Sequence, residues 1–167
     1  NDAIGAIAQN NSWGFRDASK TINAFVTYQN NNGTSDTATY VALGGDNEAN
    51  WSSYVNALND FQASGVIVFA SGNNPSEDSV DGYAGMPLVF EDLEEAWLTV
   101  GNLDVSGSTI NSSSVTRYSN PCGIAAEFCV YADGTDITST VGGYGGSSET
   151  GRYQIYDGSS MAAPMVS

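Results

Sequence analysis

The chain has 167 residues, with Lys+Arg 4 against Asp+Glu 19, no histidine, and a formal net charge of −15. So few basic groups cannot neutralise a row of phosphates, and we therefore expect no nucleic-acid partner. No apolar run approaches the roughly twenty residues that a membrane-spanning helix needs. We interpret the scattered acidity as a solvated, self-repelling surface, with the steering of cationic ligands as the alternative.

The first part of the chain predicts one strand and a long surface connection. Residues 3–8 are small and apolar, and they lead into the polar turn Asn10-Asn11-Ser12-Trp13-Gly14. This pattern indicates a buried strand that delivers a loop. Residues 29–50 are rich in Asn, Gly, Thr and Asp, so we expect them to lie on the surface as a connection or insertion.

The clearest periodic signal follows, because apolar residues recur at steps of three and four, as on one face of a helix. These residues are Trp51, Tyr54, Val55, Leu58 and Phe61. Asn50 is a candidate N-cap, and Gly65 stands where a left-handed C-terminal cap is expected. Residues 66–70 are β-branched, aromatic or small, which predicts a strand buried on both faces.

Helix, glycine and buried strand together form one step of a parallel sheet covered by helices, in which ligands bind beyond the carboxyl ends of strands. Ser71-Gly72-Asn73 lies at such an end. A second apolar strand is predicted at 97–101, after an acidic stretch at 91–95 that we interpret as a solvated loop rather than a metal site. Further on, 106–119 is polar, 142–146 is glycine-rich, and 153–156 alternates like a short strand.

Cys122 and Cys129 are the cysteines of the chain. An even count in a loop-rich chain favours a disulfide over two buried free thiols. Two thiols without a histidine cannot complete a four-ligand metal site, and we predict no metal-binding residues.

The segment at 158–164, Gly158-Ser159-Ser160-Met161-Ala162-Ala163-Pro164, combines a turn glycine, two hydroxyls and small helix-compatible residues. It predicts that Ser160 stands at a helix N-terminus, where backbone donors and the helix dipole favour negative charge on an attacked carbonyl. Taken alone, such a serine is more often an ordinary N-cap.

The same segment resembles the Gly-Thr-Ser-Met-Ala-Ala-Pro nucleophile motif of the subtilisin-like serine proteases (subtilases, peptidase S8), with Ser159 in place of threonine. The resemblance spans about residues 3–167. It implies a three-layer α/β fold, with a central parallel sheet flanked by helices and incomplete at both ends. It also implies a serine endopeptidase acting on polypeptides, with Ser160 as the catalytic nucleophile.

Other landmarks of that family occur in the same order. Residues 68–73 are similar to the strand and loop whose asparagine donates to the oxyanion, a role that would fall to Asn73, although Gly-Asn after a strand is commonly just a turn. Residues 132–137 resemble the family's Ala-Pro-Gly-x-x-Ile turn, with Asp133 in place of proline. The substrate-binding walls that the resemblance implies are Ser12, Trp13 and Gly14 on one side and Ala70, Ser71 and Gly72 on the other. For Trp13, a place in the core explains the residue nearly as well.

More narrowly, residues 87–100 and 118–129 resemble the branch found in autotransporter passenger domains of Gram-negative bacteria. This implies a secreted or bacterial cell-surface protein, followed in the parent by a possible outer-membrane barrel. We expect a monomer and no cofactor for the chemistry, and structural calcium stays open.

The family's order of catalytic residues is aspartate, histidine, serine. Residues 1–167 are therefore expected to be the C-terminal part of a catalytic domain, without the upstream aspartate strand and histidine helix and ending after the start of the serine helix. Without an imidazole the Ser160 hydroxyl is a poor nucleophile, so the chain alone should be nearly inert. The rival hypothesis is a subtilase-like scaffold that has lost catalysis and serves as a cell-surface binding or adhesion module.

Overall fold

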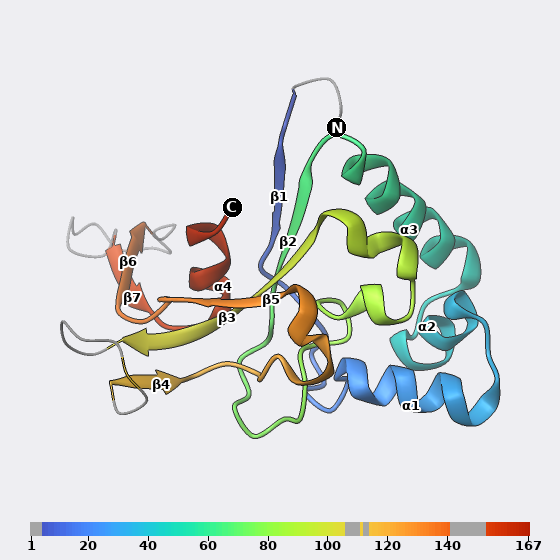
Figure 1. The fold of residues 1–167 in the computed structure, drawn as a ribbon, viewed down its shortest axis with the longest axis horizontal. Helices are drawn as coiled ribbons and strands as arrows, with labels where there is room; N and C mark the ends of the chain where they lie inside the picture. Colours follow the sequence, from blue (N-terminus) through green and yellow to red (C-terminus); the bar gives the residue numbers. More distant parts are fainter. Residues whose placement is uncertain (1–4, 106–110, 112–113, 141–152) are drawn as a thin grey trace, which may run out of the picture.

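The computed structural model describes residues 5–105, 111, 114–140 and 153–167 (Figure 1). The strands are β1 (Ala8–Asn11), β2 (Val66–Ala70), β3 (Trp97–Val105), β4 (Val115–Arg117), β5 (Cys129–Ala132), β6 (Ile137–Thr140) and β7 (Tyr153–Tyr156). The α-helices are α1 (Ile22–Asn32), α2 (Asp36–Gly44), α3 (Glu48–Gln62) and α4 (Ser159–Ala162). Short 3-10 helices are η2 (Met86–Leu88), η3 (Glu91–Ala96), η4 (Gly123–Phe128) and η6 (Ala163–Met165).

The central sheet is mainly parallel. β1 pairs with β2, β2 with β3, and β3 with β5, all in parallel. Thr99 of β3 pairs with both Phe69 of β2 and Cys129 of β5, so β5 lies on the opposite side of β3 from β2. β4 pairs antiparallel with the far end of β3, while β6 and β7 form a separate antiparallel pair. The predicted α/β class with a central parallel sheet is confirmed.

Helical segments cover both faces of this sheet (Figure 1). On one face, Ile67 and Phe69 of β2 pack into a core with residues of α1, α2 and α3. On the other face, Val68 and Ala70 pack with Val100 and the start of the C-terminal helical segment. Because side chains alternate along a strand, the short β2 contributes to both cores at once, which is why its sequence is almost continuously apolar.

The predicted amphipathic helix is α3, and its buried residues are Trp51, Val55, Leu58 and Phe61. Both predicted caps are wrong. The N-cap is Asn47, whose side chain accepts from the Asn50 N–H at 3.0 Å. Gly65 is not in a left-handed conformation, and a Cβ there would lie 2.6 Å from the Phe61 ring, so close packing explains this glycine.

The expected surface connection at 29–50 is also wrong, since it contains the end of α1, all of α2 and the start of α3. Tyr40 of α2 is fully buried, and its hydroxyl donates to the Gly82 carbonyl oxygen at 2.6 Å. Tertiary packing of this tyrosine among the rings of Phe25, Trp51 and Phe90 outweighs the polar composition around it.

The first strand lies later than predicted. β1 contains Asn10 and Asn11, which the sequence pattern placed in a turn, and the loop starts only at Ser12. Asn11 is buried, its Oδ1 accepts from Gln9 Nε2 at 3.1 Å, and its Nδ2 lies 3.4 Å from the Val68 carbonyl oxygen, so both polar atoms have a partner.

Later elements match the sequence more closely. β3 begins at Trp97 as predicted but runs on to Val105, and β7 coincides with the predicted strand at 153–156. The acidic stretch at 91–95 forms η3 rather than a loop, with Leu93 buried and the carboxylates exposed. The polar segment at 106–119 is described only at 111 and 114–119, and the glycine-rich segment at 142–146 lies outside the described residues.

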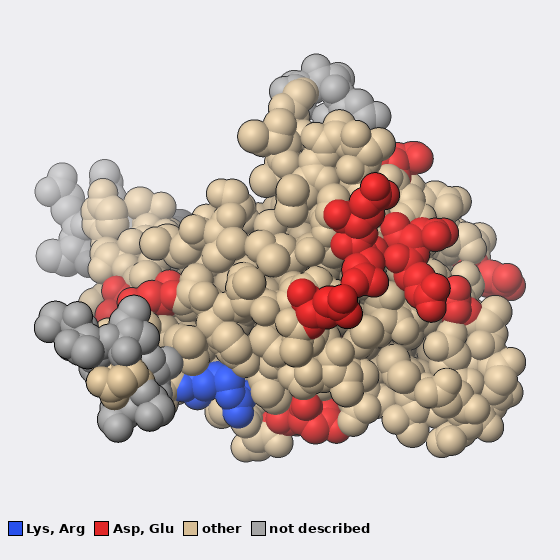
Figure 2. All heavy atoms as spheres, in the orientation of Figure 1, with Lys and Arg blue, Asp and Glu red and all other residues tan. Residues whose placement is uncertain are grey.

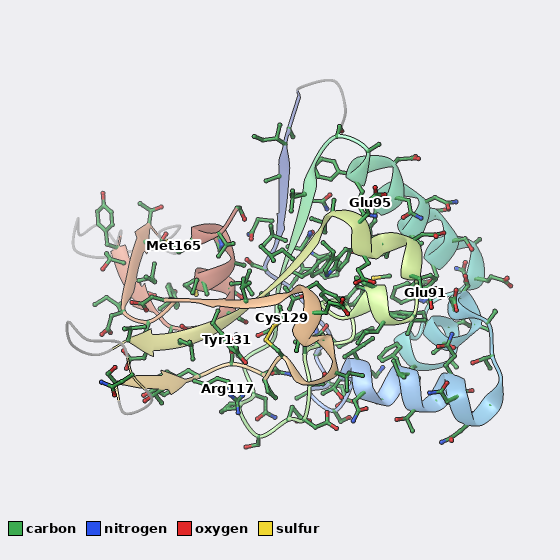
Figure 3. The ribbon with its side chains drawn as sticks, viewed as in Figure 1. Glu91, Glu95, Arg117, Cys129, Tyr131 and Met165 are labelled. Carbon is green, nitrogen blue, oxygen red and sulfur yellow. A yellow bond between two sulfur atoms is a disulfide. The ribbon has the colours of Figure 1, made fainter. Side chains whose placement is uncertain are left out.

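The predicted disulfide between Cys122 and Cys129 is confirmed, with Cα atoms 5.7 Å apart. It closes a short loop around η4 and ties the start of β5 to the segment that follows β4 (Figure 3). The Cys122 N–H also donates to the Tyr131 hydroxyl oxygen at 3.1 Å.

Acidic side chains gather on the face seen in Figure 2, over the helical side of the molecule. Glu91 and Glu95 of η3, labelled in Figure 3, are exposed on this side. Within the described ranges, no helix is both long and apolar enough to cross a membrane.

Candidate active site

The loops that follow β1 and β2 leave the sheet side by side, because Asn11 pairs with Phe69 in parallel register. These two loops and the start of α4 enclose a cleft of about 360 Å³. Every predicted catalytic or substrate-binding residue except Ser71 lines this cleft. Its described lining is Ser12, Trp13, Gly14, Phe15, Ala18, Ala70, Gly72, Asn73, Asn74, Asp81, Asn120, Ser159 and Ser160.

Ser160 is the second residue of α4 and is half-buried at the cleft. Its hydroxyl donates to the Ser12 carbonyl oxygen at 3.4 Å, and the Ser12 hydroxyl donates to the Ser160 carbonyl oxygen at 3.1 Å. Gly158 precedes the helix with φ 151°, and a Cβ at that residue would lie 3.1 Å from the Asn73 amide. Glycine at 158 therefore lets the Asn73 side chain pack closely against the start of the serine helix.

The Asn73 side chain is oriented by Ser159. Its Oδ1 accepts from the Ser159 N–H and from the Ser159 hydroxyl, each at 2.8 Å. The Ser159 N–H can only donate, so the amide atom facing it must be the oxygen. This assigns the orientation of the Asn73 side chain, with Nδ2 free to donate on the opposite side. The Ser159 hydroxyl is fully buried and also accepts from the Gly72 N–H at 3.2 Å. Serine at this position thus keeps the hydroxyl that the family's threonine would supply.

The predicted turn at 132–137 lies directly against the start of α4. The Gly158 N–H donates to the Gly134 carbonyl oxygen at 3.0 Å, and the Gly134 N–H donates to Oδ1 of Asn102 at 2.8 Å. A Cβ at residue 134 would lie 2.7 Å from the Ala162 nitrogen. Asp133, in place of proline, accepts from the Thr135 N–H at 3.1 Å and so closes the turn through its side chain.

The two walls of the cleft differ in chemistry. Trp13 is 46% exposed. The centroid of its ring lies 4.6 Å from that of Tyr83 and 5.4 Å from that of Phe69. One side of the indole therefore packs on the core while the rest stands beside the groove. On the opposite wall, Gly72 has φ 105°, and a Cβ there would lie 2.7 Å from Oδ1 of Asn120.

Ser71 is fully buried and supports this second wall from behind. Its hydroxyl is 3.4 Å from the carbonyl oxygens of Gly72 and Asn120, too long for a strong hydrogen bond. Its own carbonyl oxygen accepts from the Asp81 N–H at 2.8 Å. Ser71 therefore contributes backbone contacts rather than a side chain to the cleft.

Asn120 and Asp81 also line the cleft, and the sequence pattern gave neither of them a role. Asn120 anchors the loop after β2, because its Oδ1 accepts from the Asn74 N–H at 2.8 Å and its N–H donates to the Gly72 carbonyl at 3.0 Å. A signal for Asp81 was present: it is a lone acid in the otherwise uncharged run Ser79-Val80-Asp81-Gly82-Tyr83-Ala84. An acid in such a run is expected to be buried and to have a specific partner.

Asp81 is 8% exposed, and burial raises the pKa of its carboxyl from 3.8 to about 6. Hydrogen bonds from the N–H groups of Tyr83 and Phe15, both at 2.9 Å, partly offset that rise in pKa. At neutral pH the described part of the cleft therefore contains one ionised carboxylate that is largely shielded from water.

The chemistry available within these residues is incomplete. The chain has no histidine, so no imidazole of its own can accept the Ser160 proton. In the described ranges, no group of three or more His, Cys, Asp or Glu residues is arranged to hold a metal ion. The described part of the cleft thus presents a serine hydroxyl, an oriented asparagine amide and a buried carboxylate.

Comparison with known proteins agrees with this geometry. The family described as "Peptidase_S8: Subtilase family" matches residues 4–167. A protein of Serratia marcescens described as "Extracellular serine protease" is 39% identical over 77 residues, which cover 46% of this chain and 7% of that protein.

A solved structure described as "Structure of Prenylagaramide maturation protease PagA" has a similar fold, with a TM-score of 0.54 and 17% sequence identity. The match covers 98% of this chain and 41% of the solved chain. The matches thus cover less than half the length of each of these relatives.

Proposed function

The chain belongs to the subtilase family, and from this premise we propose that its parent protein is a serine endopeptidase with Ser160 as the nucleophile. The observation that carries the proposal is the shared cleft, which Ser160 and Asn73 both line at the carboxyl ends of two parallel strands. In open α/β sheets, ligands bind at this edge.

The chemical steps follow from the groups present. Ser160 Oγ attacks the carbonyl carbon of a peptide bond, and its proton passes to a histidine that an aspartate orients. Both of these residues would lie in another part of the parent, since this chain contains no histidine. The histidine then protonates the leaving amine, and water hydrolyses the acyl-enzyme. The 167 residues alone would be close to inert.

Two donors would hold the oxyanion of the tetrahedral intermediate. Asn73 is one of them, because Ser159 occupies its Oδ1 and so directs Nδ2 away from that contact. The second is the backbone N–H of Ser160, which as an early residue of α4 has no intrahelical acceptor. Donors that are already in position when charge develops stabilise the transition state without reorganisation.

The substrate would be a polypeptide held as an extended strand along Ser12, Trp13 and Gly14, with the wall formed by residues 70–72 on the opposite side. Ser12 already bonds to Ser160 through both its carbonyl and its hydroxyl. A main chain bound beside Ser12 would therefore present its carbonyl carbon near the nucleophile. No cofactor is needed for these steps.

We place residues 1–167 in the C-terminal part of the catalytic domain of a longer, monomeric parent. Secretion or display at a bacterial surface is supported by the name of the Serratia marcescens relative and by the disulfide, a bond that persists in oxidising compartments. Within the family, we assign the parent to the autotransporter-type branch on the residues quoted for it above.

The test uses the full-length parent and a fluorophosphonate probe, which reacts with activated serines. We expect the wild-type protein to be labelled and to hydrolyse a denatured protein substrate, and Ser160→Ala to lose both properties. Ser53→Ala, at an exposed serine of α3 outside the cleft, is the matched control and should retain both. Absence of labelling and hydrolysis in the wild type would instead favour the binding or adhesion module.

A further inference from the structure

Asp81 connects the two walls of the cleft. Its N–H donates to the Ser71 carbonyl on one wall, and its Oδ2 accepts from the Phe15 N–H on the other. A Cβ at Gly14 would lie 2.8 Å from the Asp81 carboxyl carbon, so the carboxylate packs directly against that glycine. The acid therefore lies where the walls meet, which is the base of the cleft.

No cation neutralises this carboxylate within the described part of the chain. The nearby Lys20 ammonium lies over the Phe15 ring, 5.4 Å from its centroid, and Asp81 has no ion-pair partner there. Two backbone N–H groups occupy about half of the roughly four hydrogen-bond sites that a carboxylate offers. A buried carboxylate with unfilled hydrogen-bond sites costs free energy unless a group of opposite charge binds to it.

We propose that Asp81 determines substrate preference, and that the cleft accepts the cationic side chain of an Arg or Lys residue whose carbonyl Ser160 attacks. This rests on the proposed function and specifies its substrate class. The side chain would enter between the walls, pass the small residues Gly14 and Ala70, and end on the Asp81 carboxylate.

Two further features favour a cation over a neutral side chain. The exposed part of the Trp13 indole stands at the cleft, and indole faces attract guanidinium and ammonium groups. The chain carries a formal charge of −15, and a strongly acidic protein raises the local concentration of cationic ligands.

A purely structural role for Asp81 makes a different prediction. The bond from the Tyr83 N–H to Asp81 Oδ1 spans two residues and closes a local turn, and the bond from Phe15 joins two loops. If that were the whole role, the charge of the substrate would not affect turnover. Substrates that differ only in charge therefore separate the two explanations.

The first experiment measures kcat/KM of the full-length parent for peptides with Arg, Lys, citrulline or Leu before the cleaved bond. Citrulline has the shape of arginine without its charge. We expect kcat/KM for the Arg peptide to exceed that for the citrulline peptide by roughly ten- to a hundredfold. This ratio corresponds to the free energy of a hydrogen bond to a charged group. Equal rates for Arg and citrulline would overturn the proposal while leaving the peptidase assignment intact.

The second experiment measures binding of benzamidine, a small aromatic cation, by titration of tryptophan fluorescence. We expect binding to the wild type, a loss of at least tenfold in Asp81→Asn, and no change in Asp92→Asn, which removes an exposed carboxylate of η3. Benzamidine binding that is unchanged in Asp81→Asn would overturn the proposal. If the parent hydrolyses no peptide but binds benzamidine through Asp81, the peptidase assignment fails and the cation site stands.

Discussion

The two faces of the central sheet differ sharply in the size of the residues they bury. On the face covered by α1, α2 and α3, the core is built from large side chains. Its largest fully buried members include Phe25, Tyr40, Phe69, Ile22 and Ile67. On the face covered by α4, the buried cluster consists of small residues. These are Val68, Ala70, Val100, Ala162 and Ala163.

The two faces therefore have different roles: one stabilises the fold, and the other positions the helix that carries Ser160. Large buried side chains remove more apolar area from water, so most of the hydrophobic stabilisation comes from the α1–α3 face. Small residues let backbones approach one another, and the contact of Gly134 with Gly158 and Ala162 depends on it. The helix that carries Ser160 is thus held by short backbone contacts beside the sheet, while the stabilising core lies on the other face.

The largest expected effect is on the α1–α3 face. Leu58→Ala removes a side chain that is 2% exposed and should lower the free energy of unfolding by about 3 to 5 kcal/mol, because a cavity remains. We expect kcat of the folded protein to be unchanged. Urea unfolding and peptide hydrolysis of the full-length parent measure both quantities.

The matched control for Leu58 is Asn56→Ala, on the exposed side of the same helix, which should stay within about 0.5 kcal/mol of the wild type. A large fall in kcat for Leu58→Ala, at a temperature where the variant is folded, would mean that the two faces are coupled.

At the cleft the larger effect is expected on kcat. Asn73→Ala removes an oxyanion donor, and in subtilisin the loss of such a donor lowers kcat about a hundred- to a thousandfold, or roughly 3 to 4 kcal/mol in the transition state. Asn73 is exposed, but its Oδ1 accepts from the buried Ser159 N–H, so Asn73→Ala should also lower the free energy of unfolding, by about 1 to 3 kcal/mol. Steady-state kinetics and thermal melting test this pair of outcomes, and an unaltered kcat would remove Asn73 from the oxyanion site.

Asp81 lies in the cleft, and the protonation of its carboxyl makes the free energy of unfolding depend on pH. Its folded-state pKa of about 6 lies above the unfolded value of 3.8, so the folded state binds the proton more tightly. Its contribution to stability is therefore fully present below about pH 4 and is lost as pH rises through 6, a change of about 3 kcal/mol. The phenols of Tyr40 and Tyr83, on which the Asp81 charge acts, have raised pKa values and stay neutral in this range.

The measurement compares wild type with Asp81→Asn by urea unfolding at pH 4.5 and 7, so that the other carboxylates cancel in the difference. We expect the wild type to gain stability relative to the variant as pH falls. A difference that is flat with pH would show that the carboxyl of Asp81 titrates normally in the folded protein.

Local patterns in the sequence were sufficient where a segment is long and apolar or carries a specific motif. The buried face of α3 followed from periodicity and the strand β2 from its β-branched and aromatic run, while the resemblance of residues 68–73 and 158–164 to subtilase motifs indicated that Asn73 and Ser160 belong together. The structure brings both residues to one cleft. That proximity comes from the packing of Ala162 and Ala163 against β2 and from the bond of the Ser159 N–H to Asn73, which local sequence does not specify.

Features that depend on tertiary contacts were missed. α2 was predicted as a surface connection because it buries only two residues, Thr39 and Tyr40, and each of these side chains ends in a hydroxyl. At Asp81 the sequence revealed only an acid in an otherwise uncharged run. The position of its carboxylate between the two walls of the cleft is set by the fold. Gly65 was assigned to a cap on a general rule, whereas its neighbour Phe61 fills the space that a side chain would need.

The smallest expected effect concerns the N-terminus of α3, where the cap was predicted at the wrong asparagine. Asn47 accepts from the Asn50 N–H, so Asn47→Ala should cost about 1 kcal/mol. Asn50→Ala keeps that N–H and loses only an exposed contact of its Nδ2 with Asp46, so it should cost less than about 0.5 kcal/mol. Thermal melting of the two variants ranks them, and the reverse order would place the cap at Asn50. Neither substitution should alter kcat, because this helix end belongs to the stabilising face of the sheet.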